Sequence, residues 1–217
     1  MPSEYARLFD GAQSVLDSHR GLDYGALEVA RALARKLRAP CVAATTTRLL
    51  VDLNRSPHHR NVFSEYSRVL DAAERGAVLH TYYTPYRRNV ERAAEAAARA
   101  GALLLHVSSH SFTPVLNGDV RRADVGFLYD PARPIERALA AAWETALHAR
   151  APQLALRRNY PYRGTSDALV THLRRSFSAR SYAGIEIEVN QKHVGSAEWP
   201  ALVGALAGSL TAAVATV

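Results

Sequence analysis

Two carboxylates near the C-terminus are the side chains of this sequence best placed for acid–base chemistry. Glu186 and Glu188 lie two residues apart in the run Ile185–Asn190, so on a strand both would point to the same face. Burial would raise the pKa of at least one of them, which suits a general base that takes a proton from water near neutral pH. An edge strand with a solvated acidic face is an equally good interpretation of the local pattern.

His110 and Ser111 follow an apolar strand predicted over residues 102–107. A neutral imidazole at the end of a strand is the commonest metal ligand in proteins, and a neighbouring hydroxyl can orient the imidazole or a substrate. His110 could instead be a loop histidine that caps backbone groups. His106 lies on the strand itself, so we expect it to pack in the core.

Asn54 and Arg55 follow a second apolar run, over residues 49–53, which predicts a buried strand. A guanidinium beside an amide can clamp a carboxylate, although a loop arginine usually forms a surface salt bridge. His19 and Asp23 precede a helix predicted over residues 23–37, for which Asp23 alone is best explained as the N-cap.

A turn over residues 158–164 carries three further polar or aromatic side chains that could contact a substrate or simply pack against the protein: Asn159, Tyr162 and Arg163.

The elements that position these residues alternate between strands and helices, which predicts an α/β sheet with helices on both faces and active residues at the carboxyl ends of strands. Asn117-Gly118 predicts a type I′ hairpin. Further helices are predicted over residues 65–79, 85–100, 135–149, 166–176 and 201–217. Further strands are predicted over residues 41–47, 125–129, 154–157 and 182–189.

The composition predicts one globular domain, because 48% of the 217 residues are hydrophobic and 22% are charged. The net charge of +7 does not indicate nucleic-acid binding, since the arginines are scattered among acidic residues. Neither a membrane-spanning run nor a secretory signal is present, so we expect a cytoplasmic protein. The single cysteine, Cys41, excludes an internal disulfide and a thiolate metal cage, so any metal would be bound by His, Asp or Glu.

Six segments, taken in order, resemble the signatures of the N-formylglutamate amidohydrolase family. They are His-Arg-Gly-Leu-Asp-Tyr-Gly-Ala, Arg-Leu-Leu-Val-Asp-Leu-Asn-Arg, Ser-His-Ser-Phe-Thr-Pro, Ala-Asp-Val-Gly-Phe-Leu-Tyr-Asp, Arg-Asn-Tyr-Pro-Tyr-Arg-Gly and Gly-Ile-Glu-Ile-Glu-Val-Asn-Gln. The ordered set covers roughly residues 2–193. It implies a fold similar to the zinc carboxypeptidases: a single three-layer α/β domain over residues 1–217, with a mixed, mostly parallel sheet and helices on both faces.

The resemblance implies zinc-dependent hydrolysis of the N-formyl or related N-acyl amide of an acidic amino acid, releasing formate and glutamate in the type reaction. His110 matches a zinc-ligand histidine, and Asp23 falls at the position of the acidic ligand, with His19 near it. Glu188 matches the general base, with Glu186 beside it. The metal would lower the pKa of a bound water and polarise the amide carbonyl, while the base takes the proton and returns it to the leaving amine.

The substrate is a small acidic N-acyl amino acid, so the implied site needs cationic and polar partners. Asn54 and Arg55 resemble the pair that grips a substrate carboxylate, and either Arg163 or Arg122 could serve the other carboxylate. The full set of candidate substrate-binding residues is Asn54, Arg55, Ser111, Asn159, Tyr162 and Arg163.

The chain departs from the family pattern at its start. Family members begin with a strand that ends in a segment like Cys-Glu-His-Gly-Gly-Asn-Arg, whose histidine is expected to be a primary zinc ligand, and Met1 here corresponds to a position just after it. We therefore expect the 217-residue chain to bind zinc poorly. We expect a chain extended upstream by about 15 to 25 residues to gain the strand, the ligand and activity.

Two other functions compete with this interpretation. A serine hydrolase would use Ser109 or Ser111 as nucleophile, but Ser-Ser-His-Ser lacks the glycine-flanked elbow that exposes such a serine. An activity that resists a metal chelator would favour the serine hydrolase. A vestigial family member would bind acidic ligands without turnover, and it would release no formate.

Overall fold

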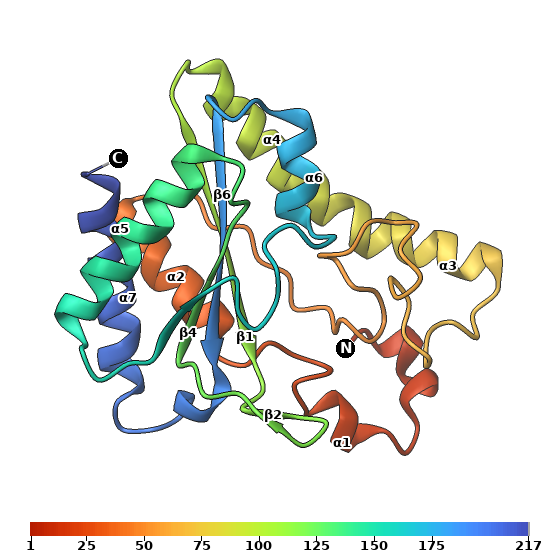
Figure 1. Cartoon of the computed structure of the whole chain (residues 1–217). Coiled ribbons are helices and arrows are strands. Elements are labelled where there is room, and N and C mark those ends of the chain that lie inside the picture. Colours follow the sequence, from red (N-terminus) through yellow and green to blue (C-terminus); the bar gives the residue numbers. More distant parts are fainter. Residues whose placement is uncertain (217) are drawn as a thin grey trace.

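The structure is a computed structural model that describes residues 1–216, and it has three layers (Figure 1). Helices α2 (Ala26–Leu37), α5 (Pro134–Arg150) and α7 (Trp199–Val214) pack together on one face of the central sheet. Helices α4 (Thr84–Arg99) and α6 (Leu169–Ser176) cover the other face. No helix in the described part of the chain is both long enough and apolar enough to span a membrane.

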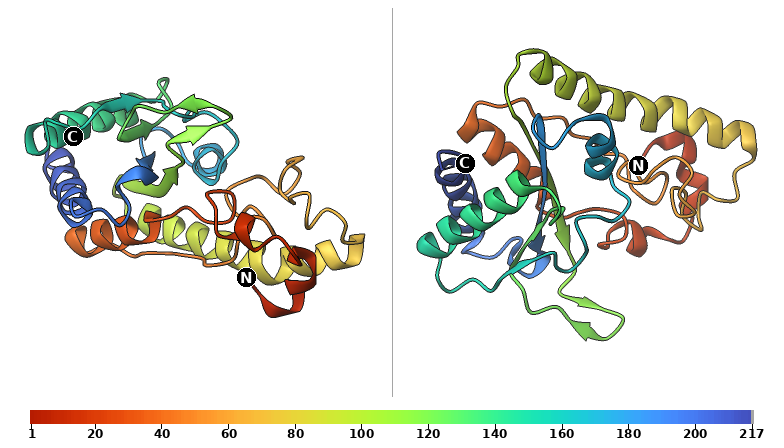
Figure 2. Two further views of the ribbon diagram at one scale, coloured as in Figure 1. Left: turned by 90° about the horizontal axis from the view of Figure 1, so that it is seen from below. Right: turned by 45° about the horizontal axis from the view of Figure 1, so that its top comes forward.

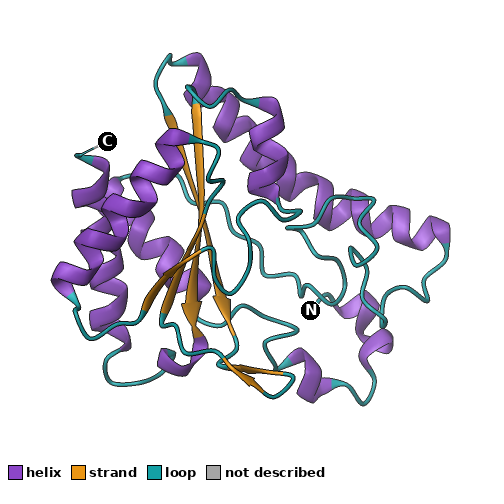
Figure 3. Cartoon of the chain, in the orientation of Figure 1, coloured by secondary structure: helices purple, strands orange, loops and turns teal. Residues whose placement is uncertain are grey.

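The main sheet has the strand order β1 (Leu104–Phe112), β6 (Tyr182–Asn190), β4 (Val125–Leu128) and β5 (Leu156–Arg158). The β1–β6 and β4–β5 pairs are parallel, and the β6–β4 pair is antiparallel. The sheet is therefore mixed and mostly parallel, as predicted. Figure 3 shows these strands between the two helical layers.

A short hairpin of β2 (Val115–Leu116) and β3 (Asp119–Val120) projects from the end of the sheet (Figure 2). Its two turn residues both have positive φ, 50° at Asn117 and 87° at Gly118. A type I′ turn requires positive φ at both central positions, so the predicted hairpin is confirmed.

Strand β6 alternates between two cores, which decides where its carboxylates point. Ile185, Ile187 and Val189 pack with the helices α2, α5 and α7. Tyr182 packs with residues of α4 and α6. Because side chains alternate along a strand, Glu186 and Glu188 share the α4/α6 face with Tyr182.

Residues 38–71 form neither helix nor strand, so the strands predicted over residues 41–47 and 49–53 are wrong. Leu49, Leu50 and Val51 are buried, but they pack in a separate cluster outside the sheet. This cluster also holds side chains of η1 (Ser3–Phe9) and lies beside α1 (Gln13–Leu16). A short apolar run predicts burial, and burial alone does not distinguish a strand from an irregular segment.

The helix predicted over residues 65–79 begins later, at α3 (Ala72–Val78). Its start is set by a capping box, in which Asp71 accepts from the backbone of Glu74 and the Glu74 side chain accepts from the backbone of Asp71. A π-helical turn, η2 (Leu79–Tyr83), joins α3 to α4. Helix α4 matches the helix predicted over residues 85–100.

Three other expectations need correction in their bounds. Helix α2 begins at Ala26 rather than Asp23, because Gly25 with φ 77° is its N-cap. Strand β1 continues to Phe112, so His110 and Ser111 lie within a strand and not in a loop after it. The C-terminal helix predicted over residues 201–217 is α7, and Val217 lies outside the described residues. The other predicted elements match α5, α6, β4, β5 and β6 within a few residues; η3 (Gln191–His193) follows β6.

Candidate active site

His110 is the centre of a hydrogen-bonded network on the α4/α6 face of the sheet. Its Nδ1 lies 2.7 Å from Asp23 Oδ2. The Arg48 guanidinium joins Asp23 to Asp52, with 2.9 Å hydrogen bonds to each. Burial alone would lower the pKa of His110, but the hydrogen bond and charge of Asp23, with the charges of the nearby glutamates, raise it to about 9. The short hydrogen bond to Asp23 fixes the orientation of the imidazole ring.

Glu186 and Glu188 lie opposite Ser108 and His110 in the parallel ladder of β1 and β6. Both glutamates are only 5% exposed. Oε2 of Glu188 is buried and has no hydrogen-bond partner among the described residues. Burial raises the pKa of Glu188 to about 8, with the neighbouring carboxylates adding to the shift and His110 opposing it. A carboxyl with these properties can accept a proton from a substrate or water beside it.

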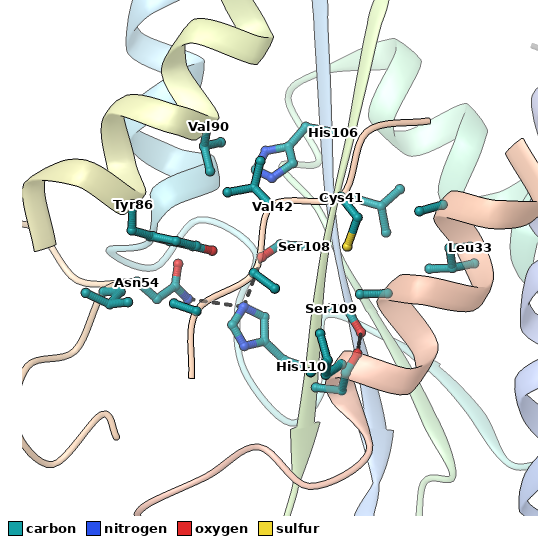
Figure 4. A pocket seen from close by; sticks show the side chains of 18 of the residues that line it. Leu33, Cys41, Val42, Asn54, Tyr86, Val90, His106, Ser108, Ser109 and His110 are labelled. Atoms are coloured by element: carbon teal, nitrogen blue, oxygen red, sulfur yellow. Dashed lines mark hydrogen bonds between the residues drawn. The ribbon is translucent and has the colours of Figure 1, made fainter. Parts of the chain in front are cut away.

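Asn54 connects the irregular segment of residues 38–71 to this row of side chains. Its amide nitrogen lies 3.4 Å from both His110 Nε2 and Glu186 Oε2. Its amide oxygen accepts a 2.8 Å hydrogen bond from the backbone of Leu169, at the start of α6. Figure 4 shows Asn54 beside Ser108 and His110.

Arg55 is not oriented like Asn54. Its guanidinium donates to the backbone oxygen of Asp167 at 2.7 Å and lies 4.0 Å from Asp52. The structure therefore brings Asn54 into the site, while the Arg55 side chain bridges two loops at its border.

The loop of residues 158–164 approaches the sheet next to Glu188. The backbone oxygen of Tyr160 lies 1.9 Å from where a Cβ of Gly126 would stand, and that same Cβ would be 3.4 Å from the Cβ of Glu188. Only glycine permits this approach. Asn159 stabilises the loop, since its side-chain oxygen accepts from the backbones of Tyr129 and Gly164.

The remaining predicted site residues are distributed around the site or outside it. Tyr162 and Arg163 are exposed on the loop, and the Tyr162 hydroxyl accepts from Arg121 at 3.1 Å. His19 is half-buried, and its pKa is lowered by burial and by the charges of nearby arginines. Ser111 lies on the opposite face of β1 from His110, where its hydroxyl accepts from Gln191.

The serine nearest His110 is Ser108, whose Oγ lies 3.0 Å from Nε2. Ser109, considered above as a nucleophile, points away from the site and donates to the backbone of Ala26 in α2. His106 packs against Tyr182, and its Nδ1 lies 2.8 Å from the Tyr182 hydroxyl, within hydrogen-bond distance.

A cavity of about 610 Å³ opens next to His110 and runs along β1 between α2 and α4. Ser108, His110 and Asn54 lie at its polar end. Its remaining walls are mostly apolar and include side chains such as Leu33, Val42 and Val90 (Figure 4).

The donor atoms near His110 are too few for the zinc site implied by the resemblance. A catalytic zinc usually has three protein ligands. Within residues 1–216, no group of three or more His, Cys, Asp or Glu side chains is arranged to hold a metal. His110 and Asp23 are a pair, and His19 does not complete a set with them. The described residues therefore do not by themselves fit a zinc ion.

Two residues of the network were missed as individual candidates from the sequence. Arg48 joins the two aspartates, and Ser108 contacts His110. The alternation of a strand that continues to Phe112 would have placed Ser108 on the face of His110. No local signal marks Arg48, because its partner Asp23 is 25 residues away.

Comparison with known proteins agrees with this architecture. A crystal structure of a gene product from Agrobacterium tumefaciens is 30% identical, with a TM-score of 0.82, over 100% of this chain and 86% of that one. The crystal structure of N-formylglutamate amidohydrolase from Ralstonia eutropha has the same fold, with 20% identity and a TM-score of 0.70 over 99% of this chain and 88% of that one. No protein with a curated function matches the sequence. The sequence profile of the N-formylglutamate amidohydrolase family matches residues 1–194, and the chain therefore belongs to that family.

Proposed function

We propose that this protein hydrolyses the N-formyl or a related N-acyl amide of an acidic amino acid, with N-formylglutamate as the reference substrate. The observation that carries the proposal is the buried Oε2 of Glu188, which has no partner among the described residues and lies in the same cross-strand row as His110. Family membership supplies the reaction class, an amide hydrolysis.

In this proposal Glu188 is the general base. Burial raises its pKa, so its carboxylate form is a stronger base than an exposed glutamate, and in that form it can take a proton from the attacking water and return it to the leaving amine. The 2.7 Å hydrogen bond between His110 Nδ1 and Asp23 fixes the imidazole ring next to that carboxyl. Asn54 donates hydrogen bonds into the same space and is held by the backbone of Leu169.

Zinc is part of the proposal as cofactor. His110 and Asp23 are the residues of this chain that offer it a nitrogen and an oxygen donor, and the set has to be completed by other donors. Elemental analysis of the purified chain measures how much zinc it binds, independently of turnover. Placement in the cytoplasm remains a prediction from the sequence.

A formate-release assay tests the reaction. Because we expect the 217-residue chain to bind zinc poorly, the assay uses excess zinc. Under this condition the wild-type chain should release formate from N-formylglutamate, and Glu188→Gln should release at most about one hundredth as much in the same time. A chelator should abolish the wild-type activity. Equal formate release by wild type and Glu188→Gln would contradict the role of this carboxylate.

A second function, binding of an acidic ligand without turnover, is favoured by one observation: no three metal-donor side chains converge in the described part of the chain. In that case N-formylglutamate would bind, and no formate would appear at any zinc concentration.

A further inference from the structure

Arg121 is a half-buried arginine on the same face of the sheet as His110 and Glu188. Phe112 and Asn190 form the next cross-strand row after His110 and Glu188. The guanidinium carbon of Arg121 lies 5.9 Å from the centre of the Phe112 ring. Alternate residues of a strand are about 7 Å apart. The charge of Arg121 therefore lies over the row adjacent to the proposed base.

The backbone of Arg121 is held in place by Asn190 of that row and by Pro114. Asn190 is fully buried, and its side-chain nitrogen donates to the backbone oxygens of Arg121 at 3.0 Å and Ala123 at 2.9 Å. The backbone N–H of Arg121 donates to Pro114 at 2.8 Å. The position of this residue is thus fixed relative to Glu188, which precedes Asn190 by two residues.

The guanidinium of Arg121 has aromatic partners and no acidic one. It lies 5.2 Å from the centre of the Tyr162 ring and donates to the Tyr162 hydroxyl at 3.1 Å. Within residues 1–216, no carboxylate oxygen lies within 4.0 Å of it, whereas Arg48 contacts two carboxylates. A stacked guanidinium keeps its planar set of N–H donors available for a carboxylate.

We propose that Arg121 binds a carboxylate of the acidic substrate and so determines the preference for acidic N-acyl amino acids. This inference rests on the proposed function. The carbon chain of the amino acid separates that carboxylate from the amide, which suits a cation one row away from Glu188. Arg55 already donates to Asp167. Arg122 is exposed and lines a different cavity, with Tyr160 and Arg157.

Equilibrium binding tests the proposal without requiring turnover. The dissociation constant of N-formylglutamate is measured by calorimetry in the Glu188→Gln background, alone and combined with Arg121→Met, which keeps the packing on the rings and removes the charge. Loss of a hydrogen bond to a charged group predicts a 10- to 100-fold increase in the dissociation constant. Arg157→Ala, which removes an exposed arginine on β5, should leave the constant unchanged.

Two analogues, each lacking one of the two carboxylates of N-formylglutamate, identify the carboxylate involved. N-formylglutamine lacks the side-chain charge, and N-formylglutamate α-amide lacks the main-chain charge. The analogue that lacks the carboxylate bound by Arg121 should have the same dissociation constant for the proteins with and without Arg121→Met. An unchanged dissociation constant for N-formylglutamate in Arg121→Met, or an increase with Arg122→Ala instead, would overturn the inference while formate release by the wild type still supports the proposed function. Absence of both ligand binding and formate release would overturn the proposed function itself.

Discussion

Strands β1 and β6 and the irregular segment of residues 38–71 position their site residues in different ways. In the strands, backbone register places His110 opposite Glu188, and the alternation of side chains sets the face. In the irregular segment, the Arg48 side chain donates hydrogen bonds to Asp23 and Asp52, and the Asn54 side-chain oxygen accepts one from the backbone of Leu169. A substitution in the strands should therefore remove a chemical group and leave the fold, whereas one in the segment should also loosen the site.

The largest effect is expected within β6, from Glu188→Gln compared with Glu186→Gln. Both residues are buried on the same face, but Glu186 Oε2 already has Asn54 as a partner, while Glu188 Oε2 has none among the described residues. We expect Glu188→Gln to lower turnover by at least about two orders of magnitude, with an unchanged melting temperature. Steady-state kinetics and circular dichroism measure the two quantities. If Glu186→Gln is the more damaging variant, the base is the other carboxylate.

A smaller effect, on stability, is expected in the irregular segment from Arg48→Ala. This change removes the hydrogen bonds to Asp23 and Asp52 and leaves two carboxylates near each other. Because the Arg48 side chain is 39% exposed, solvent screens part of the loss, and we expect the free energy of unfolding to fall by about 1 to 2 kcal/mol.

Urea denaturation measures this difference. The matched control is Arg7→Ala, which breaks an ion pair with Glu74 in which the arginine side chain is 67% exposed, and it should cost less than about 1 kcal/mol. Equal losses for the two variants would show that Arg48 does not organise the segment.

The smallest effect concerns His106, which lies on β1 four residues before His110. Burial lowers its pKa to about 4, against about 6.5 in an unfolded chain. Between these two values the unfolded chain binds a proton that the folded chain does not, so stability falls as the pH falls through this window. We expect about 1 kcal/mol of this loss between pH 7 and pH 5.5, and His106→Gln should remove it. A wild-type chain with the same pH dependence as the variant would show that His106 titrates normally when folded.

The same difference between regions explains how much of the structure the sequence predicts. Glu186 and Glu188 could be placed on one face because a strand has a period of two, and Asn117-Gly118 carries its turn type in its residues. Leu49 to Val51 are as buried as a central strand, yet their backbone partners come from Ser64, Ser67 and other loop residues. Local pattern contains no information on such distant partners, so two strands were predicted where none exists.

Asp23 shows the same limit for the site. Its place before a helix favours an N-cap, but Gly25 takes that position and the carboxylate turns to His110, 87 residues away. Among the features of the sequence, only the family resemblance connects these two residues.

Proton NMR of N-formylglutamate incubated with the zinc-supplemented protein tests the central claim most directly. The proton of free formate and the formyl proton of N-formylglutamate give separate signals, so turnover and binding are observed in one sample. The account predicts that the wild type converts the formyl signal to free formate and that Glu188→Gln leaves it at its starting intensity. A wild-type sample in which the formyl signal broadens through binding, with no formate formed, would contradict hydrolysis and identify the protein as an acidic-ligand binder.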